Sequence, residues 1–110
     1  MHWQRSCHLR RIKFIDKEYL RAQLLPALEF KKAHPDKVLA CTEFGTIRHC
    51  ISRYRENWMG DLVSLFREYD IPYSAWNYCS APYDGNKFSL VDEDSRRILS
   101  RQLAKAIFPK

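Results

Sequence analysis

The sequence lacks several features that would assign a protein to a class at once. No apolar run approaches the roughly 18 residues that a membrane-spanning helix needs. The first 14 residues, MHWQRSCHLRRIKF, contain no apolar core segment of the kind found in secretory signal peptides. There is also no internal repeat and no low-complexity linker. We therefore expect one small domain, or a piece of a larger one, without a membrane span.

Metal-binding and disulfide patterns are equally scarce. No C-x-x-C motif occurs, and the four cysteines are irregularly spaced at Cys7, Cys41, Cys50 and Cys79. Small disulfide-stabilised domains are usually denser in cysteine. Zinc ligands are normally separated by two to four residues, whereas the pairs here are adjacent, namely Cys7-His8 and His49-Cys50. The sequence predicts no metal site and no cofactor.

What the chain does contain is a moderate excess of positive charge. Lys and Arg number 19 against 13 Asp and Glu, and 45% of the residues are hydrophobic, so the composition is not that of a disordered chain. Beyond residue 13 the basic residues alternate with acidic ones, as on an ordinary solvated surface. An N-terminal tail combines charge with aromatic rings, which suits a small basic module that binds nucleic acid or an acidic partner; its residues are Trp3, Arg5, Arg10, Arg11, Lys13 and Phe14. No nucleic-acid motif accompanies that tail.

Hydrophobic spacing predicts helices alternating with strands. Asp16 is a candidate N-cap for a helix over 17–34, which Pro26 is expected to kink or break. A buried strand over 38–43 follows, then a helix over 53–69, an aromatic-rich strand over 73–78 and a last helix over 95–108. In the second helix Trp58, Leu62, Leu65, Phe66 and Tyr69 share one face, with charged residues such as Arg55 and Glu56 opposite.

The last helix has a similar apolar face. We predict that Ile98, Leu99, Leu103 and Ile107 point inward, and that Asp92, Glu93 and Asp94 lie near the positive end of this helix. Residues 1–15 show no period and are expected to be irregular. The order helix–strand–helix–strand–helix implies two parallel strands joined by a right-handed crossover. Because parallel sheets normally have more strands and are covered on both faces, this α/β pattern is typical of units from a larger structure.

The stretch VLACTEFGT, Val38 to Thr46, poses the functional question. It places a carboxylate, Glu43, at the end of an apolar strand, where burial would be costly unless the charge is paired or used. One explanation is a strand end whose carboxylate faces solvent or pairs with an arginine. The other is a catalytic carboxylate, because ligands of α/β folds gather beyond the carboxyl ends of the strands. Trp76 follows the second strand, and a carboxylate beside an exposed indole suits sugar chemistry.

At these residues the chain resembles the carboxyl-terminal part of a glycoside hydrolase of family 5, the cellulase-like (β/α)8 barrels. The matching segments are TEFGT after an apolar strand, NWMGDLVSLFREYDIPYSAWNY as helix and last strand, and FSLVDED before a closing helix. The upstream DKEYLRAQLLPALEFKKAHPDKVLACTEFG resembles the helix leading into strand seven. The resemblance implies that 16–110 is a partial (β/α)8 barrel whose two parallel strands correspond to the last two.

The resemblance also implies roles for individual residues. Glu43 corresponds to the nucleophile of a retaining glycosidase, and Trp76 to the tryptophan that packs against the sugar at the cleavage point. Asn77 and Tyr78 are interpreted as framework, Trp58 as helix core, and Arg48 and His49 as loop surface. The substrate implied is a β-glucan or related β-glycoside, an oligosaccharide or a polysaccharide.

This chain departs from the family's pattern in what it omits. The family's acid/base glutamate follows an asparagine on strand four, and neither that pair nor strands one to four occur here; Glu56, on a predicted helix, is a poor substitute. Ser89 stands where the family often has glycine. We therefore expect a fragment that is inactive alone and has the missing N-terminal part of the barrel as a possible partner. The family is largely exported, but the chain carries no export signal, which leaves the compartment open.

Overall fold

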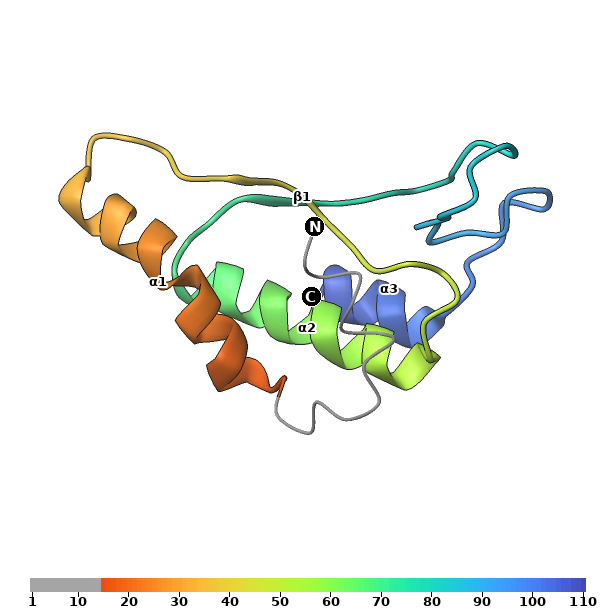
Figure 1. Ribbon diagram of the computed structural model, residues 1–110, viewed down its shortest axis with the longest axis horizontal. Helices are drawn as coiled ribbons and strands as arrows, with labels where there is room; N and C mark the ends of the chain where they lie inside the picture. Colours follow the sequence, from red (N-terminus) through yellow and green to blue (C-terminus); the bar gives the residue numbers. More distant parts are fainter. Residues whose placement is uncertain (1–14) are drawn as a thin grey trace.

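A computed structural model of the protein describes residues 15–110. The elements follow the order α1 (Lys17–Ala33), β1 (Cys41–Phe44), α2 (Ser52–Glu68), β2 (Tyr73–Ala75) and α3 (Arg101–Ile107). The order of three helices and two strands is as predicted, and β1 and β2 pair in parallel. Figure 1 shows the strand pair lying along one side of α2 and α3, with α1 at one end. The described helices include none with the length and apolar character needed to cross a membrane.

The helix α1 begins where the sequence predicts. The Asp16 carboxylate accepts a hydrogen bond from the backbone N–H of Tyr19 at 2.8 Å, which satisfies one of the free donors of the first turn. The helix continues through Pro26 to Ala33, so of the two predicted effects of Pro26, a kink or a break, the break is wrong. Arg21 donates to Glu68 and to the Tyr69 hydroxyl, both at 2.6 Å, and these bonds attach α1 to α2.

The hydrophobic core lies between α2 and the elements that pack on it, namely α1, α3 and the strand pair. The apolar stripe of α2 packs against α3 and the strand pair, and its buried hydrophobic members are Trp58, Met59, Leu62, Val63, Leu65 and Phe66. Phe44 of β1 and Tyr73 of β2 lie against Phe66, with ring centroids 5.3 and 5.6 Å away. The predicted apolar face of the second helix is therefore confirmed, with one exception, Arg55, described below.

Both strands are shorter than predicted. The hydrogen-bonded pair covers only 41–44 and 73–75, and Val38 is 85% exposed, so the expected buried strand from Val38 is wrong. The reason is that β2 offers only three residues to pair with. Upstream of Cys41, whose N–H donates to Pro72 O at 2.8 Å, no described strand extends the ladder.

The last helix starts later than predicted because a turn replaces its first part. The backbone N–H of Arg96 donates to the carbonyl oxygen of Asp92 and closes this turn. The Asp92 carboxylate accepts a hydrogen bond from Ser95 N at 2.8 Å, and Arg96 has a positive φ of 62°. Ser100 is the actual N-cap, accepting from Leu103 N at 3.0 Å.

Two further predictions for this segment are also wrong. Ile98 and Leu99 are exposed rather than inward-facing, since they precede the helix, whereas Leu103 and Ile107 are buried as expected. The acidic run from Asp92 lies in the turn and not at the end of α3.

Candidate active site

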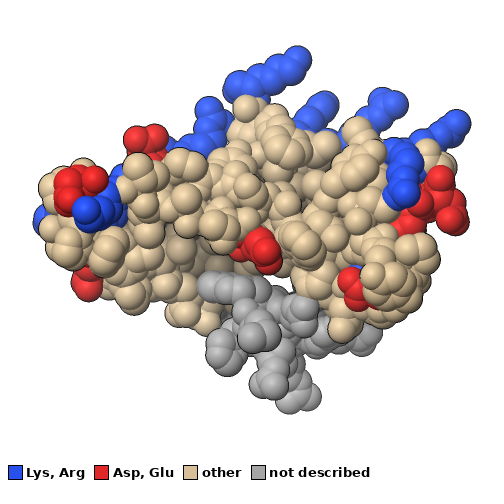
Figure 2. Space-filling model, turned by 90° about the horizontal axis from the view of Figure 1, so that it is seen from above, with Lys and Arg blue, Asp and Glu red and all other residues tan. Residues whose placement is uncertain are grey.

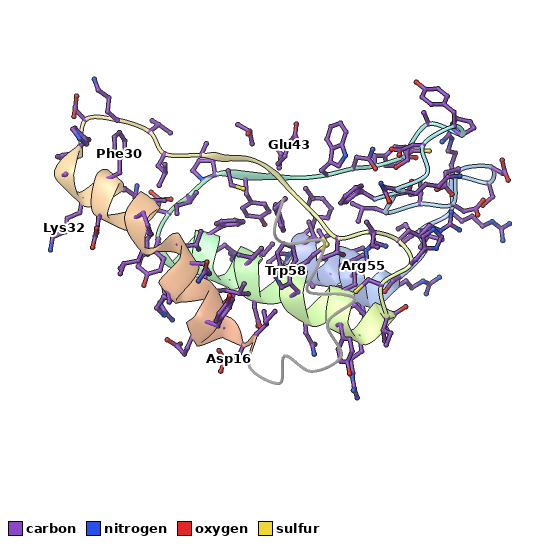
Figure 3. All side chains as sticks on the ribbon, in the orientation of Figure 1. Asp16, Phe30, Lys32, Glu43, Arg55 and Trp58 are labelled. Carbon is purple, nitrogen blue, oxygen red and sulfur yellow. The ribbon has the colours of Figure 1, made fainter. Side chains whose placement is uncertain are left out.

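Glu43 lies on β1 at a local irregularity. Cys41 pairs with Tyr73 and Phe44 pairs with Ala75, so three steps along β1 match two along β2. The extra residue means that Thr42 and Glu43 are both exposed, between residues that pack on the core. A bulge of this type redirects a side chain and is common next to active sites. Figure 3 shows Glu43 pointing away from the helices.

The Glu43 carboxylate makes no ion pair or side-chain hydrogen bond with any residue in 15–110. Of the two forms that the strand-end explanation allowed, a solvent-facing carboxylate or one paired with an arginine, the described residues show the first. A solvent-facing carboxylate at the carboxyl end of a strand is what both a simple strand end and a catalytic group would present.

Trp76 directly follows β2 at the same edge. Its N–H donates to Phe44 O at 2.7 Å, which places the start of this loop beside the end of β1. Tyr73 and Ala75 contact the core, whereas the Trp76 side chain is 46% exposed. The peptide bond between Trp76 and Asn77 is cis. The two site residues predicted from the sequence thus lie at neighbouring strand ends, and neither is part of the hydrophobic core.

Gly45 couples the two strand ends. A Cβ at this position would lie 2.1 Å from the carbonyl oxygen of Trp76 and 3.2 Å from its carbonyl carbon. A contact of 2.1 Å does not occur between a Cβ and an atom to which it is not bonded, so any side chain here would displace the backbone of Trp76. The glycine of the TEFGT segment is required by this approach.

Arg55 is a site-supporting residue that the sequence reasoning placed wrongly. It is only 5% exposed, although we predicted it on the charged face of the second helix. Its Nε donates to Thr46 Oγ1 at 3.1 Å, and its Nη2 donates to the carbonyl oxygens of Phe88 and Ser89 at 2.8 and 2.9 Å. Burial, reinforced by the nearby Arg48, lowers the pKa of Arg55. One guanidinium thereby joins the loop after β1 to the loop after β2.

The signal for a buried Arg55 was present in the spacing. Arg55 precedes Trp58 by three residues and Met59 by four, so Arg55 occupies the same helix face as those core residues. Charge alone led to the opposite assignment. Long basic side chains can bury their stems when the polar end finds acceptors, and the loop carbonyls supply them here.

A second polar connection lies further along the same loops. Arg48, predicted as loop surface, forms ion pairs with Glu93 and, at 3.6 Å, with Asp92. Hydrogen bonds from Ser95 hold the pKa of Asp92 below its usual value. For Glu93, burial acts to raise the pKa, but the hydrogen bonds to its carboxylate, from Arg48 and Ser89 among others, and the charge of Arg48 together outweigh burial, so the pKa is lowered.

Ser89 explains one departure from the family's pattern. Its side chain is fully buried, its hydroxyl accepts from Ser80 N at 2.8 Å, and it donates to Glu93 at 3.1 Å. A glycine at this position could make neither bond. The Ser89 hydroxyl therefore connects two parts of the loop after β2, at Ser80 and at Glu93.

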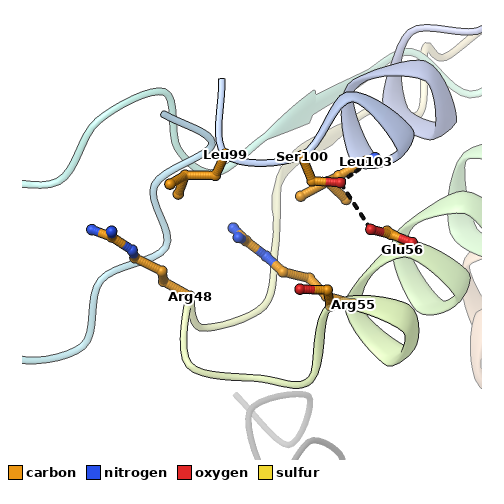
Figure 4. Close-up of a pocket in the computed structure, with 7 residues that line it drawn as sticks. Arg48, Arg55, Glu56, Leu99, Ser100 and Leu103 are labelled. Atoms are coloured by element: carbon orange, nitrogen blue, oxygen red, sulfur yellow. Dashed lines mark hydrogen bonds between the residues drawn. The ribbon is translucent and has the colours of Figure 1, made fainter. Parts of the chain in front are cut away.

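A cavity of about 180 Å³ lies at the start of α2, away from Glu43 and Trp76. Figure 4 shows Arg48 and Arg55 extending into it and Glu56 bonded to Ser100 at 2.8 Å. Glu56 belongs to this cavity, and its carboxylate is engaged by Ser100. It does not join Glu43 to form a pair of carboxylates.

Several predicted features cannot be compared with the structure. The basic and aromatic tail from Trp3 to Phe14 lies outside the described residues, as does the pair Cys7-His8. Within 15–110, no group of three or more His, Cys, Asp or Glu side chains is arranged to hold a metal ion. Asn77 Oδ1 accepts from the Ser80 hydroxyl at 3.2 Å, which fits its expected framework role.

The chain is similar in sequence to known endoglucanases. No model of a protein family matches the chain. Endoglucanase C of Acetivibrio thermocellus is 37% identical to it over 93 residues, which cover 84% of this chain and 25% of the relative. Endoglucanase C307 of Clostridium sp. (strain F1) matches with the same identity and coverage. The chain is thus similar to endoglucanases over most of its own length, and it spans about a quarter of the length of these relatives.

Proposed function

We propose that this chain carries the nucleophile-bearing edge of a retaining glycoside hydrolase of the cellulase-like family 5. The observation that carries the proposal is that Glu43 and Trp76 lie at the carboxyl ends of two adjacent parallel strands, in a chain similar to endoglucanases. The substrate class is a β-glucan or a related β-glycoside.

Glu43 supplies the nucleophile in this proposal. A retaining glycosidase uses one carboxylate to attack the anomeric carbon and form a glycosyl-enzyme intermediate, while a second carboxyl group protonates the leaving oxygen. A carboxylate that has no ion-pair partner within residues 15–110 can approach a sugar without first breaking a contact to those residues. The bulge in β1 supports this role, since it turns Glu43 away from the core that holds Phe44.

Trp76 supplies the sugar-binding surface. Sugar rings present flat faces of C–H groups that pack on aromatic rings, and an indole that is 46% exposed at a strand end can receive one. The close approach of Gly45 to the Trp76 carbonyl brings the backbone of Trp76 beside the chain that leaves β1, two residues after Glu43.

The second carboxyl group comes from additional polypeptide. The two groups of a retaining enzyme stand about 5–5.5 Å apart, and no carboxylate of the described residues bonds to Glu43 or shares its strand edge. We infer that residues 16–110 form the last part of a (β/α)8 barrel, with the outer edges of β1 and β2, which pair with no other described strand, available to further strands. Alone, the chain is expected to be inactive, because losing general acid catalysis costs roughly 10²–10⁴-fold and substrate positioning is lost as well.

The test is a chimera in which this chain replaces the matching quarter of the Acetivibrio thermocellus endoglucanase. We expect the chimera to hydrolyse a soluble cellulose derivative, and Glu43→Gln to reduce its rate at least about a thousandfold, the upper range for losing one group that stabilises the transition state. Glu29→Gln, a change on the exposed surface of α1, is the matched control.

Folding is checked by cooperative thermal unfolding of each chimera. A folded chimera without activity would overturn the proposal, and so would a Glu43→Gln variant that keeps its activity.

A further inference from the structure

Large exposed aromatic side chains are concentrated in the loop that follows β2. Trp76 is 46% exposed, Tyr78 is 62% exposed and Tyr83 is 93% exposed, and the three lie within one short segment of the chain. Figure 1 shows this loop continuing beyond β2 on the side of the molecule that carries the strands. Single exposed aromatic residues need no explanation, but a series that starts at a proposed sugar-binding tryptophan does.

The base of the loop is fixed by hydrogen bonds. Ser80 N donates to Ser89 Oγ at 2.8 Å, and Phe88 N donates to Ser80 Oγ at 3.1 Å, so the two ends of the segment are held together. Arg55 fixes the same base from below through the carbonyls of Phe88 and Ser89. An aromatic ring on a loop with a fixed base has a defined position, which lowers the entropy cost of binding a ligand.

The tip of the loop carries the chemistry that sugars need. Tyr83 lies in a turn closed by Asp84 N and Ala81 O at 3.0 Å, and Asn86 N donates to one carboxylate oxygen of Asp84, also at 3.0 Å. The turn leaves the Tyr83 ring almost wholly in solvent. An open aromatic face beside an acidic and an amide side chain can pack on the C–H face of a sugar and bond its hydroxyl groups.

We propose that Tyr83 forms a second sugar-binding position, which takes a unit of a β-linked glucan chain lying beyond the unit on Trp76. The proposal rests on the proposed function, since it assigns a further unit of the same substrate. Seven steps along the chain, with six residues in between, separate the two aromatics, so their Cα atoms lie at most about 25 Å apart. In this proposal a glucan of several sugar units reaches both rings, whereas a short oligosaccharide occupies the position at Trp76 alone.

The experiment measures binding of cellotriose and cellohexaose to the full chain by isothermal titration calorimetry. Tyr83→Ala is expected to weaken cellohexaose binding about three- to tenfold, the range for losing one aromatic contact, and to leave cellotriose binding unchanged. Tyr83→Phe keeps the ring and is expected to bind like the unsubstituted chain. Tyr19→Ala removes an exposed tyrosine of α1 and is the matched control.

The outcomes separate the two proposals. If Trp76→Ala abolishes binding but Tyr83→Ala behaves like Tyr19→Ala with cellohexaose, the second position is refuted and the proposed function stands. A loss with Tyr83→Phe as large as with Tyr83→Ala would refute ring packing. If the unsubstituted chain binds neither oligosaccharide, the second position is refuted for this chain, whereas the proposed function is decided separately by the activity of the chimera.

Discussion

The two faces of the β1–β2 pair do different things with very few residues. One face packs Phe44 and Tyr73 against α2, and the other leaves Glu43 and Trp76 to solvent. Figure 2, seen from above, shows this second side as mostly uncharged surface with acidic atoms near its centre and Lys and Arg side chains along one edge. Consecutive residues of one strand therefore have opposite surroundings: Phe44 stabilises the core, and Glu43 is left exposed for the chemistry that we propose.

The sharpest way to probe that difference is to truncate two neighbours. Phe44→Ala removes a ring that is only 8% exposed and contacts Phe66 and Tyr73. We expect the free energy of unfolding to fall by about 3–5 kcal/mol, the usual cost of deleting a buried aromatic side chain. Glu43→Ala, one residue earlier, should change it by no more than about 0.5 kcal/mol. Urea denaturation followed by circular dichroism measures both, and equal losses would show that the faces are not separate.

A substitution at Gly45 should damage both faces together. The added methyl group of Gly45→Ala meets the Trp76 carbonyl at 2.1 Å, so the backbone must move, and we expect a loss of about 2–3 kcal/mol in stability. Oligosaccharide binding should weaken with it, because Trp76 is displaced. Gly85→Ala is the control, since a Cβ there meets no atom within 4 Å. Similar melting temperatures for the two variants would contradict the required close approach.

The smallest expected effect concerns the support beneath the open face. Arg55→Met keeps the apolar stem but leaves the Phe88 and Ser89 carbonyls without their donor, which should cost about 1–2 kcal/mol. Arg53→Met, an exposed neighbour on the same helix, should have almost no effect. Hydrogen exchange would localise the change: we expect faster exchange at Phe88 N and Ser80 N and unchanged exchange in the centre of α2.

The parts of the fold that the sequence predicted well are those in which local signals and packing agree. Asp16 is both a good N-cap and the residue at the correct place before an apolar stripe, and α1 begins there. Hydrophobic spacing identified the core face of α2 because the same residues meet the strands and α3. The parallel pairing followed from the order of elements.

The errors arose where tertiary contacts overrule local preference. The segment from Asp92 looks like the start of a helix, but the Asp92 carboxylate caps a turn and the helix waits for Ser100. Val38 looks like a buried strand residue, yet it has no strand to lie beside among the described residues. Arg55 was misplaced because two of its acceptors, the carbonyls of Phe88 and Ser89, come from a loop more than 30 residues away, which no local pattern records.

The site itself was only partly accessible to sequence reasoning. The positions of Glu43 and Trp76 at adjacent strand ends could be predicted from strand order, and the structure brings them to one edge. The bulge could not be predicted, because it depends on a count of residues along two strands taken together. The role of Ser89 could not be predicted either, because its partners Ser80 and Glu93 lie in separate parts of the loop.

The bulge also determines which changes in chain length this region can accept. Between the two register pairs, β1 advances by three residues and β2 by two. Deleting either Thr42 or Glu43 would make the two advances equal, so that β1 and β2 would pair without a bulge. The core contacts of Cys41 and Phe44 would survive such a deletion, while the chain would be left with one outward-facing residue in place of two. A single lost codon at this point would therefore yield a folded protein with an altered site, whereas most deletions elsewhere in a strand turn its core side outward.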